Sequence, residues 1–285
     1  MQHGVKTFSI AVALSVALVG CSASVPSSTS SSSDGPVVPA TQVDDQAVLK
    51  VDKLVAFSDV ERKAYNKAAQ DCMVQHGHAP RENYPELSLR SVRQLVIPRA
   101  LSVEEARTYG YISSTEQKRG ENGTHSVREV ELSEAEYKDF AAGSEGQDNS
   151  CQAQALTRVY GNEELWKNYM ILDSYILPYV SAYLDSSSYS GINRQWSECM
   201  KSKSYDYSSP GAAIRSATNA KNTQELAIAD TQCREGVKYE ENLHEGLNAY
   251  MTTFLNENQG LMDQVAQAKK NAEANAPKIL DGTVS

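Results

Sequence analysis

The sequence has no excess of basic residues. Its 285 residues contain 27 Lys and Arg against 36 Asp and Glu, which gives a formal net charge of −9. A surface that binds nucleic acid phosphates, or that adsorbs to an anionic membrane, needs Lys and Arg in excess. The charge balance therefore argues against a nucleic acid partner. The length allows one large domain or two small ones with an ordinary core.

The common catalytic and metal-binding signatures are also missing. The sequence has no G-x-S-x-G, S-x-x-K or H-E-x-x-H motif, no P-loop and no G-x-G-x-x-G. These patterns accompany many hydrolases and nucleotide-binding proteins. No C-x-x-C occurs either, so a zinc site or a thioredoxin-like redox pair is poorly supported. We therefore assign no catalytic residue, no metal site and no cofactor, and we expect a protein that is not an enzyme.

Long apolar runs are confined to the N-terminus. Lys6 precedes an apolar stretch over residues 7–18, which has the length of a signal-peptide core and is shorter than the ~20 residues that span a bilayer. Leu18-Val19-Gly20-Cys21 then resembles the lipobox of bacterial lipoproteins. The resemblance implies that residues 1–20 are removed, that Cys21 carries diacylglycerol, and that the protein is anchored on the extracytoplasmic face of the cell membrane. The alternative is a plain secretory cleavage site followed by a coincidental Cys.

Residues 21–46 have the composition of a stalk. Removal of residues 1–20 takes away one Lys and no acid, so the net charge becomes 26 − 36 = −10. Ser, Thr, Pro, Val and Asp dominate the next segment, and such a composition cannot bury enough apolar surface to offset the loss of chain entropy. We predict a flexible stalk that lifts the folded part off the lipid.

The remaining chain is rich in helix signals. S-x-x-E capping boxes begin three expected helices, at Ser58, Ser102 and Ser133. Further helices are expected over residues 151–160, over residues 162–185 with a kink at Pro178, and, as a short helix, around residues 196–200. A long helix is expected over residues 223–271, with a bend or break at Gly236, Gly246 or Gly260. The tail after it should fray from Ala274 through Pro277. Residues 112–132 are expected to be a loop with a short strand. The pattern predicts a mainly α, disulfide-stabilised body with a long C-terminal helix.

Four Cys remain after the lipobox. An exported chain meets oxidising surroundings, in which an even number of Cys pairs, and three connectivities are open. We favour Cys72–Cys151 and Cys199–Cys233, because sequential pairing ties helix to helix and matches an internal echo. Residues 72–78 and 199–205 both read Cys-Met, three polar or mixed positions, a small residue and a ring. The echo is consistent with two related halves, over residues 47–185 and 186–285.

Three loose patterns extend over most of the mature chain. They are the Cys-Met helix ends, an A-x-x-x-G-Y segment from Ala106 to Tyr111, and A-x-x-D-x-x-C over Ala227, Asp230 and Cys233. Together they resemble a group of actinobacterial lipoproteins, although His78 stands where the pattern has an aromatic residue and Ser204 where it has Gly. The resemblance implies an envelope location and association with neighbouring export or cell-wall machinery. It carries over no catalytic residue.

Reactive side chains are scattered. His76-Gly77-His78 offers two imidazoles to zinc or copper, but no third ligand is near in the sequence, so a surface turn is favoured. Glu134 with Glu136 and Glu240 with Glu241 are favoured as solvated helix faces over acid–base pairs. His125 and His244 stand alone.

Tyrosines are the remaining candidates for function. Tyr169, Tyr175, Tyr179 and Tyr183 recur at helical spacing beside Trp166, and a core position is favoured over a contact face. Tyr205 and Tyr207 are expected on the surface.

Three functions are compatible with these features. The first is a non-enzymatic accessory module that engages an envelope assembly, such as a transporter or cell-wall machinery. The second is a ligand-binding lipoprotein for a peptide, glycan or metal. The third is a hydrolase of unrecognised type, which would need scattered carboxylates gathered in a cleft.

Overall fold

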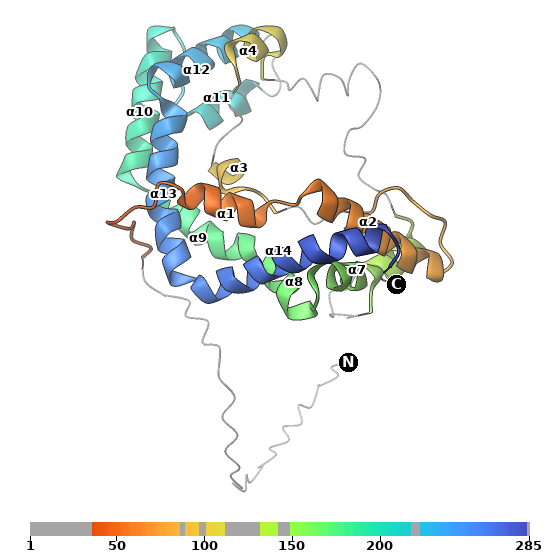
Figure 1. Cartoon of the computed structure of the whole chain (residues 1–285). Helices are drawn as coiled ribbons and strands as arrows, with labels where there is room; N and C mark the ends of the chain where they lie inside the picture. Colours follow the sequence, from red (N-terminus) through yellow and green to blue (C-terminus); the bar gives the residue numbers. More distant parts are fainter. Residues whose placement is uncertain are drawn as a thin grey trace, which may run out of the picture. The chain divides into compact units, whose positions relative to one another are not determined.

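The computed structural model describes residues 36–85, 89–96, 101–111, 132–141, 149–217 and 223–283 (Figure 1). The signal peptide, the lipobox Cys21, His125 and residues 112–131 lie outside the described residues. Within the described residues every regular element is an α-helix. The helices are α1 (Ala47–Val55), α2 (Asp59–Gln75), α3 (Val92–Val96), α4 (Val103–Tyr109), α6 (Glu134–Phe140), α7 (Cys151–Tyr160), α8 (Glu163–Met170), α9 (Leu172–Leu184), α10 (Ser187–Ser202), α11 (Pro210–Ala217), α12 (Gln224–Gly236), α13 (Tyr239–Glu257) and α14 (Gln259–Leu280). The mainly α fold is thus as the sequence predicts.

Residues 36–285 form one compact unit with a continuous apolar core. The C-terminal helix α14 packs against α2, α7 and α8 (Figure 1). Helix α13 packs against α1, α9 and α10, while α12 lies against α4, α10 and α11. Because α14 comes from the second predicted half and its neighbours α2, α7 and α8 from the first, the two halves share packed surface.

Three helices begin where the capping boxes predict. In α2 the Ser58 hydroxyl accepts the Glu61 N–H, and the Glu61 carboxylate accepts the Ser58 N–H at 2.7 Å. Helices α4 and α6 repeat this reciprocal pair at Ser102 and Ser133. Each pair satisfies two backbone donors that the first helical turn leaves without a partner.

The two Cys-Met helix ends share one backbone geometry. Gly77 and Ser204 both have positive φ, 86° and 70°. The residue after each donates its N–H to a carbonyl five residues earlier, His78 to Met73 and Tyr205 to Met200, both at 3.0 Å. This is the Schellman helix end. The sequence echo therefore extends to the hydrogen-bonding pattern.

Two disulfides join these helix ends to neighbouring helices. Cys72 bonds to Cys151 at the start of α7, and Cys199 bonds to Cys233 in α12. The Cα–Cα distances are 5.4 and 5.6 Å. This is the sequential pairing expected from the sequence, and three of the four residues are buried.

The segment from residue 223 onward is three helices and not one continuous helix. Lys238, in the left-handed region at φ 51°, separates α12 from α13. Asn258 separates α13 from α14, and its side-chain amide donates to the Phe254 carbonyl at 2.9 Å, which competes with helix continuation. Gly236 and Gly260 flank the two breaks, whereas Gly246 lies inside the unbroken α13.

Three further expectations about helix bounds are wrong. The expected helix over residues 162–185 is broken at Ile171, whose carbonyl accepts the Ser174 hydroxyl at 2.5 Å, and Pro178 lies inside α9. The tail does not fray at Ala274, because α14 continues to Leu280 and buries Ala276 and Ile279. The helix around Trp196, expected to be short, extends over all of α10.

Residues 36–46, which the composition assigns to the stalk, lie against α13. Ala40 donates its N–H to the Ala249 carbonyl at 3.1 Å. The Thr253 hydroxyl donates to the Val38 carbonyl, and the Asn248 side chain donates to the Asp45 carbonyl, both at 2.9 Å. Polar side chains of α13 thus hold the backbone of this segment, which composition alone does not reveal.

Candidate functional site

Asp230 is the centre of a buried polar cluster. Its carboxylate accepts hydrogen bonds from Trp196 Nε1 and Arg234 Nε, both at 2.9 Å, and from the Tyr111 hydroxyl at 3.2 Å. Asp230 and Arg234 are each only 3% exposed. Burial raises the pKa of Asp230, and the Arg234 guanidinium acts against that rise. Buried charges of this kind are retained only when they are paired and hydrogen-bonded.

The cluster unites patterns that are far apart in the sequence. The A-x-x-x-G-Y segment and the A-x-x-D-x-x-C helix pack together, with Ala106 and Ala227 both fully buried. A Cβ at Gly110 would lie 2.2 Å from Thr223 Oγ1, so the close approach of α4 to α12 requires Gly there. Packing between α4 and α12 therefore explains why the two patterns have small residues at Ala106, Gly110 and Ala227. The polar cluster itself joins α10 and α12 to the residue that follows α4, Tyr111.

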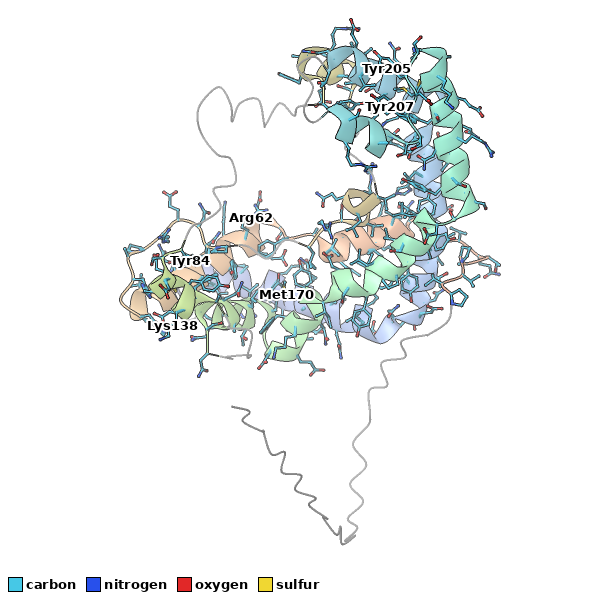
Figure 2. The ribbon with its side chains drawn as sticks, turned by 180° about the vertical axis from the view of Figure 1, so that it is seen from behind. Arg62, Tyr84, Lys138, Met170, Tyr205 and Tyr207 are labelled. Atoms are coloured by element: carbon cyan, nitrogen blue, oxygen red, sulfur yellow. A yellow bond between two sulfur atoms is a disulfide. The ribbon has the colours of Figure 1, made fainter. Side chains whose placement is uncertain are left out.

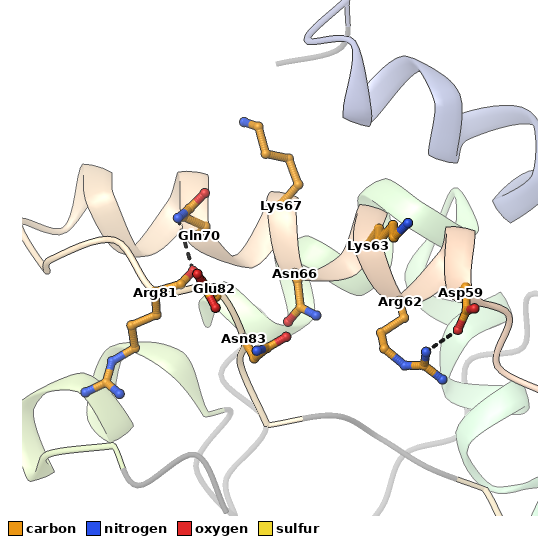
Figure 3. A pocket seen from close by; sticks show the side chains of 9 residues that line it. All are labelled: Asp59, Arg62, Lys63, Asn66, Lys67, Gln70, Arg81, Glu82 and Asn83. Carbon is orange, nitrogen blue, oxygen red and sulfur yellow. Dashed lines mark hydrogen bonds and ion pairs between the residues drawn. The ribbon is translucent and has the colours of Figure 1, made fainter. Parts of the chain in front are cut away.

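A polar groove lies along α2 and encloses about 350 Å³ (Figure 3). It is lined by Asp59, Arg62, Lys63, Asn66, Lys67, Gln70, Arg81, Glu82 and Asn83. Figure 3 shows Arg62 paired with Asp59, and the Gln70 amide donating to the Arg81 carbonyl at 3.0 Å. The lining combines four cationic side chains, three amides and two acids, and Arg62, Lys67 and Arg81 are paired with Asp59, Asp71 and Glu136. The groove is therefore a polar surface with hydrogen-bonding groups of both kinds.

A second hollow, of about 450 Å³, contains the Glu240 and Glu241 pair. Its lining is Asp45, Arg93, Glu240, Glu241, His244, Glu245 and Asn248. Glu240 accepts from Arg234 at 3.1 Å and Glu241 pairs with Lys238 at 3.4 Å. Glu241, with its side chain 63% exposed, lies on a solvated helix face as expected, whereas Glu240 is half-buried beside Arg234. His244 lines the same hollow.

The H-x-H turn contacts helix α6. His78 Nε2 lies 2.7 Å from Asp139 Oδ2, and His76 Nδ1 lies 3.9 Å from the same oxygen. The turn itself is as predicted, and Asp139 is the carboxylate that pairs with it. Asp139 is separated from His78 by 61 positions, so no local pattern could reveal the contact.

Glu136 serves as a helix cap and an ion-pair partner. It accepts two hydrogen bonds from the Arg81 guanidinium, at 2.8 and 2.9 Å, and it also caps α6 through Ser133. The Arg81 and Ser133 hydrogen bonds lower the pKa of Glu136 to about 2. Glu134 lies on the exposed side of α6, so the structure does not bring Glu134 and Glu136 together as an acid–base pair.

The tyrosines mostly belong to the core. Tyr169, Tyr179 and Tyr183 are buried, as the core interpretation predicts, and Tyr175 is exposed. Trp166 is half-buried and donates its ring N–H to Thr157 at 3.0 Å. Tyr205 and Tyr207, expected on the surface, are half-buried against the core in the connection between α10 and α11 (Figure 2).

Comparisons with known proteins add no relative. No protein-family model, no curated protein and no solved structure matches this chain. Among the described helices, none has both the length and the apolar character that a membrane crossing needs.

Proposed function

We propose that this protein is a lipid-anchored extracytoplasmic lipoprotein that acts as a non-enzymatic accessory module of an envelope assembly. The observation that supports the location best is the pair of disulfides within the helical body, Cys72–Cys151 and Cys199–Cys233. Disulfides persist in oxidising compartments and are rare where thiols are kept reduced. A lipobox ahead of such a body is the expected arrangement for a protein held at the outer face of a membrane.

The anchor is tested by fractionation of cells that express the full chain. The wild-type protein is expected in the membrane fraction and to carry acyl chains by mass spectrometry. Cys21→Ser should abolish acylation and membrane retention, because the acyl chains on the Cys21 thiol are the proposed hold on the bilayer. Ser22→Ala is the matched control and should leave both unchanged. Membrane retention of unacylated Cys21→Ser protein would contradict the anchor.

The accessory role is tested by crosslinking in intact cells. A photoreactive residue in place of Tyr175, which is exposed on α9, can react with a partner that binds to this face of the protein. Reproducible capture of one envelope protein is expected, and it should disappear when the probe is moved to the buried Tyr183. Recovery of lipid alone from every exposed probe position would argue against the accessory role.

The groove along α2 favours ligand binding as a second candidate function. Its cations and amides suit a polar, oxygen-rich ligand such as a cell-wall glycan fragment. A soluble glycan fragment at 100 times its dissociation constant should add about 2.7 kcal/mol of stability in a thermal-shift titration. Lys63→Glu should remove that shift, whereas Lys201→Glu on the exposed face of α10 should not. An unchanged shift with Lys63→Glu would exclude this groove.

A further inference from the structure

We propose that the groove along α2 binds the acetamido group of an N-acetylated amino sugar, with Asn66 as the hydrogen-bond donor and Gln70 as the acceptor. The proposal rests on the second candidate function, ligand binding in this groove, and names the chemical class of the ligand. All nine lining side chains are polar or charged, so this part of the described surface offers no apolar pocket for the side chains of a peptide. Sugar hydroxyls both donate and accept hydrogen bonds, which suits such a lining.

Asn66 has a buried amide with unused donors. It is only 9% exposed, and its Oδ1 accepts the Tyr84 N–H at 2.8 Å. This backbone donor fixes which end of the amide is the oxygen. Nδ2 is then the other end, and it has no hydrogen-bond partner among the described residues. Figure 3 shows the Asn66 side chain pointing from α2 toward the segment that carries Asn83. A largely buried donor is costly to leave unpaired, so a ligand oxygen is favoured at this point.

Gln70 supplies the complementary acceptor. Its Nε2 donates to the Arg81 carbonyl at 3.0 Å, which leaves Oε1 as the end that no described residue engages. Gln70 follows Asn66 by four positions in α2, so the two amides lie on one face of the helix with their Cβ atoms about 5–6 Å apart. One donor beside one acceptor is complementary to a secondary amide, whose carbonyl accepts and whose N–H donates.

The charges of the groove favour a neutral group. Three of its four cations are engaged in the ion pairs described above, which hold these side chains and neutralise the walls. Lys63 is the cation that has no ion pair with the described residues, and it is exposed at the rim. An acetamido group carries no charge, so it can bind between Asn66 and Gln70 without breaking any of these pairs.

Both walls are held in place before any ligand binds. Helix α2 is tied to α7 by the Cys72–Cys151 disulfide. Opposite it, the buried Tyr84 ring stacks on Phe140 with the ring centroids 5.4 Å apart, which fixes the chain next to Asn83. A preorganised site loses less entropy on binding. The groove follows α2 over residues 59–70, which is about 16 Å at 1.5 Å per residue, so a short oligosaccharide fits along it.

The test compares two trisaccharides that differ only at the proposed group. Tri-N-acetylchitotriose has a 2-acetamido group on each ring, and cellotriose has the same linkage with a 2-hydroxyl instead. In calorimetric titration of the full chain, in detergent with the disulfides intact, the acetylated ligand is expected to bind at least about tenfold more tightly, because cellotriose leaves both amides unpaired. Equal affinities would overturn acetamido recognition, although glycan binding in the groove would stand.

Asn66→Asp removes the donor and keeps the structural acceptor. The carboxylate still has an oxygen for the Tyr84 N–H but no N–H to donate, so the affinity for the acetylated trisaccharide should fall at least about tenfold. Asn256→Asp adds the same charge at an exposed position of α13 and should leave the affinity unchanged. Circular dichroism verifies the fold of each variant. Unchanged affinity in Asn66→Asp would overturn the proposal.

A second measurement needs no substitution. In the wild-type chain, the acetylated trisaccharide should shift the side-chain amide proton resonances of Asn66 and Gln70 and leave those of Asn256 in place. Absence of these shifts, or tighter binding of trialanine than of the acetylated trisaccharide, would overturn the proposal. Failure of both trisaccharides to bind would also remove glycan binding in the groove, whereas the accessory role is decided separately by crosslinking.

Discussion

The Glu136 carboxylate stabilises both helix α6 and the segment that contains Arg81. It caps its own helix through Ser133 and fixes Arg81 with two hydrogen bonds, and these contacts require the charged form. The capping role was predictable from the S-x-x-E spacing. The contact with Arg81 was not, because its 55-residue separation has no signature in the sequence.

The Glu136 pKa predicts a stability change in acid. The folded-state pKa of about 2 is below the ordinary value of 4.5, so the stabilisation is complete above about pH 4.5 and is lost as the pH falls toward 2. In denaturant unfolding, wild type should exceed Glu136→Gln in stability at pH 6, and the difference should shrink between pH 4.5 and 2. Glu134→Gln is the control and should keep the wild-type pH profile. A difference that stays constant over this interval would contradict the assignment.

Asp230 predicts a large loss of stability from a single substitution. Asp230→Ala removes the acceptor of the Arg234 Nε–H and of the Trp196 ring N–H, both of which lie in the buried cluster. Removal of one partner from a buried pair costs about 3–5 kcal/mol of unfolding free energy. Asp206→Ala, at a side chain that is 86% exposed, should change stability by less than about 0.5 kcal/mol. Equal effects of the two variants in urea unfolding would show that the cluster is not a structural anchor.

At the scale of elements, the helix starts were predictable and several helix ends were not. A capping box is a local interaction within four residues, so Ser58, Ser102 and Ser133 reveal it directly. The breaks at Lys238 and Asn258 interrupt a segment whose apolar spacing continues through them. Contacts such as that of the Asn258 amide with the Tyr179 hydroxyl decide such breaks, and they exist only in the folded chain.

Replacement of Gly by Ala should change the free energy of unfolding in opposite directions at Gly246 and at Gly191. A Cβ at Gly246 in α13 would lie 2.4–3.0 Å from the buried Tyr183 ring, whereas a Cβ at Gly191 in α10 meets nothing within 4 Å. Gly246→Ala should therefore lower the unfolding free energy by about 1–3 kcal/mol through overpacking. Gly191→Ala should raise it by about 0.5–1 kcal/mol, because Ala loses less backbone entropy in a helix. Thermal unfolding of the pair checks this, and a shift of the same sign in both would contradict the close packing of α9 on α13.

At the scale of the whole molecule, the capping boxes and apolar spacing predicted the helical class, and the internal echo favoured the disulfide pairing that the structure has. The candidate sites were mostly hidden, because each joins segments distant in sequence. Tyr111 reaches Asp230 across 119 positions, and His78 reaches Asp139 across 61. A single sequence shows that such polar and titratable residues are present, but it does not show which of them contact one another in the folded chain.

The shared core predicts how the disulfides act on the molecule. Loops of 79 and 34 residues give losses of about 4–5 and about 4 kcal/mol when the Cys72–Cys151 or Cys199–Cys233 pair is replaced by Ala, in the chain-entropy description. Because α14 packs on α2, α7 and α8, the body should still unfold in one transition after either replacement.

Hydrogen exchange checks this directly. Loss of Cys199–Cys233 should reduce protection in α2 as well as in α12, since global unfolding exposes both helices. The matched pair Cys72→Ala/Cys151→Ala should reduce protection in the same two helices by a slightly larger amount. If removal of Cys199–Cys233 left α2 protected while α12 exchanged freely, residues 47–185 would unfold independently, and the two predicted halves would be separate cooperative units despite the packing of α14.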